Sequence, residues 1–201
     1  MLKDKKIIVG VTGSIAAVKA PILVSRLIKE GATVQCVVTK SALNLVSPIS
    51  LATLSRNPCL QDKDQWDAHQ PRPLHISLAE WADLMVVAPL SATTLAKWAN
   101  GLADGLLPSL LVAFEGPVIA AAAMNTAMWE YPSIQKNWQS IRNNQDILAL
   151  EPAKGLLACD QFGIGKIPTN DLISLAIKFV FLQENNYFND LTNKSFLITG
   201  G

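Results

Sequence analysis

Five short runs of apolar, often β-branched residues alternate along this chain with segments that carry a helical spacing of apolar residues. The runs are continuous, which is typical of strands buried on both faces of a parallel sheet. Helical connections between parallel strands are right-handed and cover both faces of the sheet. The sequence therefore predicts an α/β fold, a Rossmann-like (flavodoxin-like) doubly wound parallel sheet in three αβα layers. The expected strands are 7–11, 33–38, 84–88, 118–122 and 147–150.

The expected helices are 16–29, 45–54, 78–81, 94–99, 106–114, 133–142 and 170–184. Two segments do not fit the alternation of strand and helix. Residues 56–74 are polar and contain three prolines, so we expect a loop there. Residues 151–168 contain Gly155, Gly163 and Gly165 and predict a long flap. Segments of this length without regular structure are usually functional or disordered.

The last residues, 194–201, have the pattern of a further strand that opens into a glycine turn. We therefore expect residues 1–190 to form one domain and residues 191–201 to be a linker and the first strand of a second, truncated domain. A C-terminal strand that belongs to the first domain is the alternative.

Composition disfavours several classes of protein. The 201 residues have a formal net charge of +1, so charge provides no attraction to nucleic acid or to an anionic membrane. No segment approaches the roughly 20 apolar residues that span a bilayer. Three cysteines without metal-type spacing indicate reduced thiols in a cytoplasmic protein with no metal site. Only 16% of residues are charged, which is compatible with faces covered by partner subunits.

The turn after the first expected strand, Gly10-Val-Thr-Gly-Ser-Ile, leads directly into a helical pattern. It lacks the lysine of a P-loop, and no acidic residue ends the second strand as in dinucleotide-binding folds. Backbone amides at such a turn bind phosphate, so a mononucleotide is the better interpretation. A plain tight turn is the alternative. The candidate phosphate ligands are Gly13, Ser14, Ile15, Thr39 and Ser41.

Further polar and sulfur-containing residues follow the later strands or lie in the expected flap. Carboxyl ends of parallel strands share one edge of the sheet, where ligands bind. Each residue also has a structural interpretation, as a helix cap, a surface residue or part of the core. The candidates are His75, Ser91, Thr94, Met124, Asn125, Met128, Cys159 and Lys166.

Five motifs in order resemble the homo-oligomeric flavin-containing cysteine decarboxylases. They are GSIAAxK (13–19), HIxL (75–78), APxSAxT with its tail to Leu106 (88–106), MNxxMW (124–129) and the AC…GxG flap (158–165). The resemblance covers about residues 5–182, and within the family it is greatest to the phosphopantothenoylcysteine decarboxylase domains of bacterial coenzyme A biosynthesis. Those domains are often fused to a C-terminal ligase domain that begins with a similar strand and glycine turn.

The resemblance implies FMN as cofactor and decarboxylation of 4′-phospho-N-pantothenoylcysteine to 4′-phosphopantetheine as the reaction. It assigns the Gly13 turn to the FMN phosphate. Other residues that it assigns to cofactor binding are Thr39, Ser41, Ser91, Thr94 and Met124. It implies His75 as the base, Asn125 as the ligand of the substrate carboxylate and Cys159 as the acid of the final reduction. Met128 and Lys166 would contact substrate. Family members form trimers, or larger assemblies of trimers, with FMN at the subunit interfaces.

Two residues depart from the family pattern. Thr93 replaces an asparagine, and Asp160 replaces a glycine that adopts positive φ easily, so we expect the flap to close differently. The alternatives are a peptidyl-cysteine decarboxylase, a flavin prenyltransferase, a non-catalytic flavin-binding homologue and an NAD-dependent dehydrogenase. The flap cysteine disfavours the first, and the missing ribose-binding acid disfavours the last.

Overall fold

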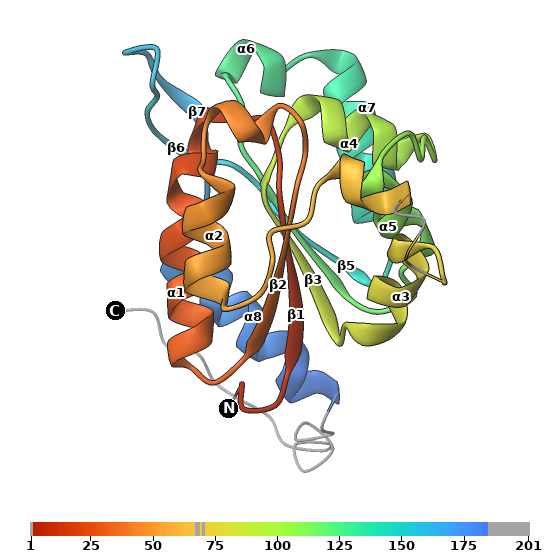
Figure 1. The fold of residues 1–201 in the computed structure, drawn as a ribbon. Helices are drawn as coiled ribbons and strands as arrows, with labels where there is room; N and C mark the ends of the chain where they lie inside the picture. The colour runs from red at the N-terminus through yellow and green to blue at the C-terminus, as the bar shows by residue number, and fades with distance from the viewer. Residues whose placement is uncertain (1, 67–68, 70, 185–201) are drawn as a thin grey trace, which may run out of the picture.

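The computed structural model describes residues 2–66, 69 and 71–184, and a five-stranded parallel sheet lies at its centre (Figure 1). The strand order is β2-β1-β3-β4-β5, and every neighbouring pair is parallel. The strands are β2 (Thr33–Val38), β1 (Lys6–Val11), β3 (Leu84–Leu90), β4 (Val118–Ala122) and β5 (Ile147–Leu150). The predicted flavodoxin-like sheet is confirmed. The order reverses between β1 and β3, which places a crevice at their carboxyl ends.

Helices cover both faces of the sheet, in separate hydrophobic cores. One face carries α1 (Ala20–Lys29), α2 (Pro48–Ser55) and α8 (Asn170–Glu184). The other carries α3 (Leu74–Trp81), α4 (Ala92–Ala99), α5 (Leu106–Ala113) and α7 (Pro132–Arg142). The two groups lie on opposite sides of the sheet in Figure 1. β3 and β4 are buried along their whole length because helices cover them from both sides.

Several expected boundaries are wrong for local reasons. The helix expected over 16–29 is a 3₁₀ turn, η1 (Ile15–Lys19), followed by α1, which restarts at Ala20 with a proline in its first turn. The helix expected from residue 45 begins only at Pro48, after η2 (Ala42–Asn44), because Ser47 caps it by accepting from the Ser50 amide at 3.5 Å. α3 begins at Leu74, four residues before the expected start.

Both segments expected to lack regular structure contain some. Residues 56–74 include a short 3₁₀ helix, η3 (Asp62–Trp66). The flap is an antiparallel hairpin of β6 (Ala153–Leu156) and β7 (Phe162–Lys166) that precedes α8. A short helix, α6 (Thr126–Trp129), follows β4. The linker and strand expected at 191–201 lie outside the described residues. In the part of the chain described, no helix is long and apolar enough to cross a membrane.

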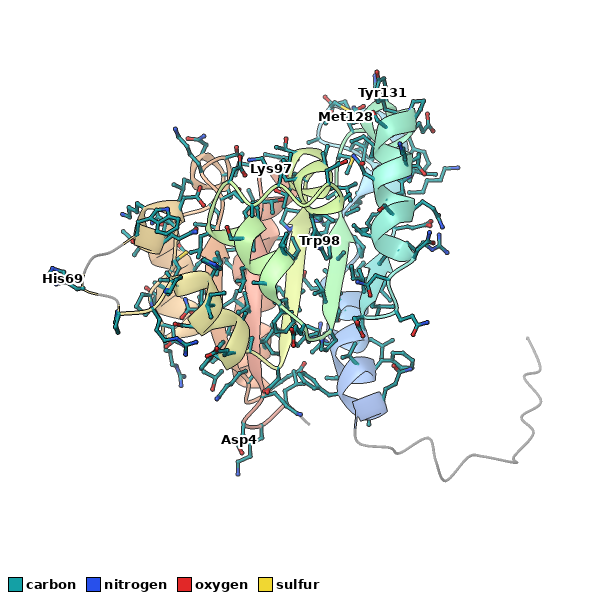
Figure 2. All side chains as sticks on the ribbon, turned by 90° about the vertical axis from the view of Figure 1, so that its right-hand side faces the viewer. Asp4, His69, Lys97, Trp98, Met128 and Tyr131 are labelled. Atoms are coloured by element: carbon teal, nitrogen blue, oxygen red, sulfur yellow. The ribbon has the colours of Figure 1, made fainter. Side chains whose placement is uncertain are left out.

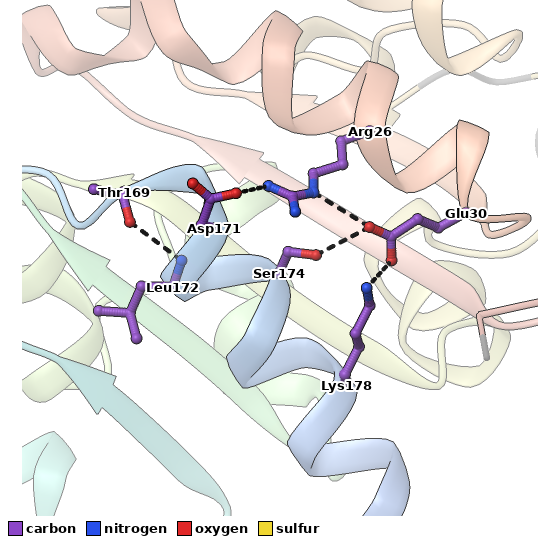
Figure 3. Close-up of polar contacts among 7 residues, drawn as sticks. All are labelled: Arg26, Glu30, Thr169, Asp171, Leu172, Ser174 and Lys178. Carbon is purple, nitrogen blue, oxygen red and sulfur yellow. Dashed lines mark hydrogen bonds and ion pairs between the residues drawn. The ribbon is translucent and has the colours of Figure 1, made fainter.

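A cluster of ion pairs fastens α8 to α1 on one face of the sheet (Figure 3). Glu30, at the end of α1, accepts from Arg26 at 3.2 Å and from the Ser174 hydroxyl at 3.2 Å, and pairs with Lys178 at 2.8 Å. Arg26 also pairs with Asp171. Burial acts to raise the pKa of Glu30, but hydrogen bonds from Lys178 and Arg26 outweigh it and hold that pKa below its ordinary value. The Glu30 carboxylate is therefore ionised in the folded protein and joins the two helices.

We expect Glu30→Gln to lower the free energy of unfolding by about 1–2 kcal/mol at neutral pH, because it removes the charge that binds Lys178 and Arg26. Because the pKa of Glu30 is lowered in the folded protein, its carboxylate contributes fully to stability above the ordinary pKa of 4.5. This contribution is lost as the pH falls through the pKa that Glu30 has in the folded state. Urea unfolding across this range measures both effects. Glu115→Gln, at an exposed position, is the control. An equal loss in both variants would contradict the role of the cluster.

Candidate active site

A cavity of about 580 Å³ lies at the carboxyl ends of β1, β3 and β4, where the hairpin also reaches the sheet. Its volume falls within the range of roughly 300–1,000 Å³ typical of small-molecule sites. Its walls come from the turn after β1, the loop after β3, the loop after β4 and the hairpin. The predicted residues that line it are Gly13, Ser14, Ile15, Ser91, Met124, Asn125, Met128, Cys159 and Lys166. Thr39, Ser41, Thr94 and His75 do not line it.

A buried threonine joins the two strand ends that frame the cavity. The Thr12 hydroxyl donates to the Pro89 carbonyl at 2.7 Å and accepts from the Ser91 amide at 2.8 Å. Thr12 is fully buried, so both hydrogen bonds are protected from water. Thr12 is not among the site residues predicted from the sequence, although its position as a hydroxyl residue directly after an apolar strand could have indicated it. This contact fixes the loop that carries Ser91 against the turn that carries Ser14.

The turn after β1 has the geometry of a capped helix start. Ser14 accepts from the Ala16 amide at 3.5 Å and begins η1. Gly13 lies against Ser41, and a Cβ added to Gly13 would come 2.5 Å from the Ser41 Cβ. Glycine at position 13 is therefore required for the two loops to approach. The Thr39 hydroxyl oxygen is buried and has no hydrogen-bond partner among the described residues.

The loop after β3 places Ser91 and Thr93 in the lining of the cavity and uses Thr94 for support. Ser91 caps α4 by accepting from the Thr94 amide at 3.4 Å, and its hydroxyl lies 3.3 Å from the Thr94 hydroxyl. Thr94 is buried behind Ser91 and orients it, whereas Thr93 is exposed and lines the cavity. The departure from the family pattern at Thr93 therefore changes the wall of the cavity.

Asn125 is held with its amide nitrogen toward the hairpin. Its Oδ1 accepts from the Ala127 amide at 2.9 Å and so caps α6. Its Nδ2 lies 3.4 Å from the Cys159 Sγ. Because the oxygen is occupied by the cap, the donor end of the side chain faces the cavity. Met128, from the same segment, lies at the rim (Figure 2).

The hairpin is fastened to the end of β4 through its glycines. The Met124 amide donates to the Gly165 carbonyl at 3.1 Å, and a Cβ on Gly165 would come 2.1 Å from the Met124 carbonyl oxygen. Asp160, at the tip, adopts the left-handed conformation with φ of 60°. Aspartate tolerates this conformation better than most residues, so the exchange for glycine keeps a positive-φ position in the tip.

Of the three cysteines, only Cys159 is exposed, and it lies at the tip of the hairpin beside the cavity. Burial raises the pKa of the Cys36 thiol to about 12 and that of Cys59 to about 11, which keeps both protonated. Cys159 is therefore the thiol available for chemistry in the cavity.

The charged groups of the cavity are cationic. Lys19 and Lys166 line it, and the described residues of its lining include no carboxylate. Lys166 is among the site residues predicted from the sequence, whereas Lys19, which ends η1 only six residues after Gly13, is not. Two ammonium groups in a described lining without carboxylates favour an anionic ligand. The described part of the chain contains no group of histidines, cysteines and carboxylates that could hold a metal ion.

His75 lies away from the cavity of its own chain. It is in the first turn of α3, on the face of the sheet that also carries α5, and its Nδ1 lies 3.5 Å from the Gln65 Nε2. Of the three residues predicted to be catalytic, the single chain thus brings together Asn125 and Cys159 but not His75.

Comparison with known proteins adds the following relationships. The Flavoprotein family model matches residues 1–181. The coenzyme A biosynthesis bifunctional protein CoaBC of Bacillus subtilis is 37% identical over 204 residues, covering 100% of this chain and 48% of that protein. The chain thus spans about half the length of such relatives.

Two solved structures are similar over nearly their whole length. A PPC decarboxylase variant complexed with pantothenoylaminoethenethiol has a TM-score of 0.80 at 33% identity, over 89% of this chain and 99% of that one. The FMN-binding protein AtHal3 has a TM-score of 0.78 at 34% identity, over 90% of this chain and 98% of that one.

We expect Gly165→Ala to displace the hairpin, because its Cβ would overlap the Met124 carbonyl oxygen. Overpacking of this kind costs about 1–3 kcal/mol. Limited proteolysis at the tip should become faster while the sheet stays folded by circular dichroism. Gly155→Ala is the matched control on the other strand of the hairpin, since its Cβ would meet only the Lys166 Cδ at 3.3 Å. Equal rates of proteolysis at the tip in the two variants would contradict the role of Gly165 in holding the hairpin.

Proposed function

The chain belongs to the flavoprotein family, and we propose that it is an FMN-dependent decarboxylase that converts 4′-phospho-N-pantothenoylcysteine to 4′-phosphopantetheine. The observation that carries the proposal is the pairing of Asn125 and Cys159 in one cationic cavity, with Nδ2 and Sγ 3.4 Å apart. An amide donor and a thiol in contact suit a substrate that carries a carboxylate and must be protonated during turnover. Similarity to the PPC decarboxylase variant and to AtHal3 supports the same assignment.

The residues of the cavity fit FMN. The turn at Gly13, Ser14 and Ile15 opens a helical segment and suits a phosphate, to which Lys19 adds positive charge. The Thr39 hydroxyl lies outside the lining of the cavity but has no partner among the described residues and would be a further donor, and Ser91 and the buried Met124 suit the ring system. When bound, FMN supplies reversible hydride transfer, which creates and then removes the electron sink that decarboxylation needs.

Asn125 would hold the substrate carboxylate. Its capping bond to Ala127 fixes the oxygen, so the nitrogen is the atom presented to an anion. A neutral donor orients a carboxylate without the charge stabilisation that would oppose its loss as carbon dioxide. Lys166, from β7, would bind a second anionic group of the substrate, and Met128 would cover it at the rim.

Cys159 would donate the proton for the final reduction. It is exposed at the hairpin tip, where the Gln161 side chain accepts from its thiol at 3.9 Å. The hairpin brings this acid to the same side of the cavity as Asn125. A thiol that donates here restores the saturated product, whereas an enzyme without it would stop at the unsaturated one.

His75 would act in the cavity of a neighbouring subunit, because it lies outside the lining of its own. We therefore propose a homotrimer, or an assembly of trimers, with sites between subunits. We further propose a cytoplasmic enzyme that works together with a ligase domain, in keeping with relatives named as bifunctional and twice as long.

The proposal is tested by anaerobic incubation of the purified, yellow protein with phosphopantothenoylcysteine and mass spectrometry of the product. A product lighter by carbon dioxide alone is expected. A product lighter by carbon dioxide and two hydrogens would assign the chain to the decarboxylases that stop at the unsaturated thiol. Absence of flavin after reconstitution, or of any turnover, would refute the proposal.

We expect His75→Asn to retain flavin and to reduce kcat by about 100-fold or more, because it removes the base. The flavin spectrum and steady-state kinetics measure the two effects. His69→Asn is the matched control, since His69 lies on the outer side of the molecule (Figure 2). Equal activity in the two variants would remove His75 from the reaction.

We expect Cys159→Ser to release carbon dioxide and to accumulate the unsaturated product, because a hydroxyl is a far weaker acid than a thiol. Mass spectrometry distinguishes the products by two hydrogens. Cys59→Ser replaces a thiol outside the cavity and should form the saturated product. Full formation of 4′-phosphopantetheine by Cys159→Ser would exclude the acid role.

A further inference from the structure

The polar segment between α2 and α3 is anchored at several points before it reaches His75. Leu60 bridges to β2, where its amide donates to the Cys36 carbonyl at 2.9 Å. The Asp62 carboxylate accepts from the Leu106 amide at 2.9 Å and so caps the start of α5. The Asp64 carboxylate accepts from the Gln61 amide at 2.8 Å. These bonds hold the segment against β2 and fix η3 at the start of α5.

Gln65 is the residue that this arrangement buries. Its side chain is 6% exposed, and its Nε2 lies 3.5 Å from the His75 Nδ1. Its Oε1 is buried and has no hydrogen-bond partner among the described residues. A buried amide with one unpaired end costs folding free energy that a hydrophobic side chain of the same size would not. Gln65 is therefore poorly explained by stability alone.

We propose that Gln65 is the positioning residue of His75 and satisfies Nδ1 in each protonation state that His75 passes through. In the observed arrangement the Gln65 amide donates to a bare Nδ1, so the neutral ring carries its proton on Nε2. When Nδ1 is protonated, a half-turn of the amide presents Oε1 as the acceptor. Among the described residues, Oε1 has no other partner that would prevent this turn.

The role rests on the proposed function, because it matters only if His75 exchanges protons during turnover. A glutamate at position 65 would accept but not donate, and would hold the proton on Nδ1. A methionine would fill the same volume and do neither. Of the three side chains, only the amide can pair with Nδ1 both with and without its proton.

The test uses ¹⁵N NMR of the flavin-loaded protein at about pH 9, where imidazole rings are neutral and nitrogen shifts report the tautomer. The chain has two histidines, and His69→Asn leaves the spectrum of His75 alone. In that background we expect mainly the Nε2–H form with Gln65, mainly the Nδ1–H form with Gln65→Glu, and a mixture with Gln65→Met. Gln61→Met, four residues earlier, is the matched control and should leave the tautomer unchanged.

Kinetics with phosphopantothenoylcysteine complete the test. We expect Gln65→Met to lower kcat by about 10-fold with little change in KM, because the base is misoriented while substrate contacts persist. The same tautomer in all variants, or a kcat unchanged in Gln65→Met, would overturn the proposal. If the unmodified protein has no turnover, the proposed function fails. Even without turnover, a His75 tautomer that changes in the Gln65 variants would establish the contact between Gln65 and His75. A tautomer that stays the same in those variants would overturn the proposal.

Discussion

The candidate site depends on the two hydrogen bonds by which the Thr12 hydroxyl joins the ends of β1 and β3. In a doubly wound sheet the crevice opens where the strand order reverses, here between β1 and β3. Nothing in the sheet itself sets the relative positions of the loops that leave those two strands. Thr12 sets them by bonding the carbonyl of Pro89 and the amide of Ser91 from within the core. The turn after β1 and the Ser91 loop therefore form one rigid wall.

The hairpin completes that wall by backbone contact rather than by side-chain packing. Gly165 lets β7 lie against the carbonyl of Met124, and this contact places Cys159 next to Asn125. Asn125 is itself oriented by its cap on α6. The thiol and the amide thus owe their proximity to a backbone contact between β7 and the end of β4 and to the side-chain cap on α6, neither of which involves a charged group.

His75 lies on the face of the sheet that carries α3 and α5. α3 and η3 place His75 and Gln65 together but away from the cavity of their own chain. Asp62 joins η3 to the start of α5, so the position of this pair depends on the packing of three elements. Because of this separation we propose that His75 acts in the cavity of a neighbouring subunit. Its orientation then depends on Gln65, its immediate partner within its own chain.

The sequence by itself determined the sheet, because continuous apolar strand runs and intervening helices admit few topologies. Nine of the thirteen site residues predicted from the sequence line the cavity, since strand ends of a parallel sheet meet at one edge. Only the tertiary structure decided that Thr94 supports Ser91, that the flap is a hairpin, that Thr12 joins the two loops, that Lys19 lines the cavity and that Gln65 lies beside His75. Their roles depend on contacts between segments far apart in the chain, such as the 79 residues from Thr12 to Ser91, which no local pattern records.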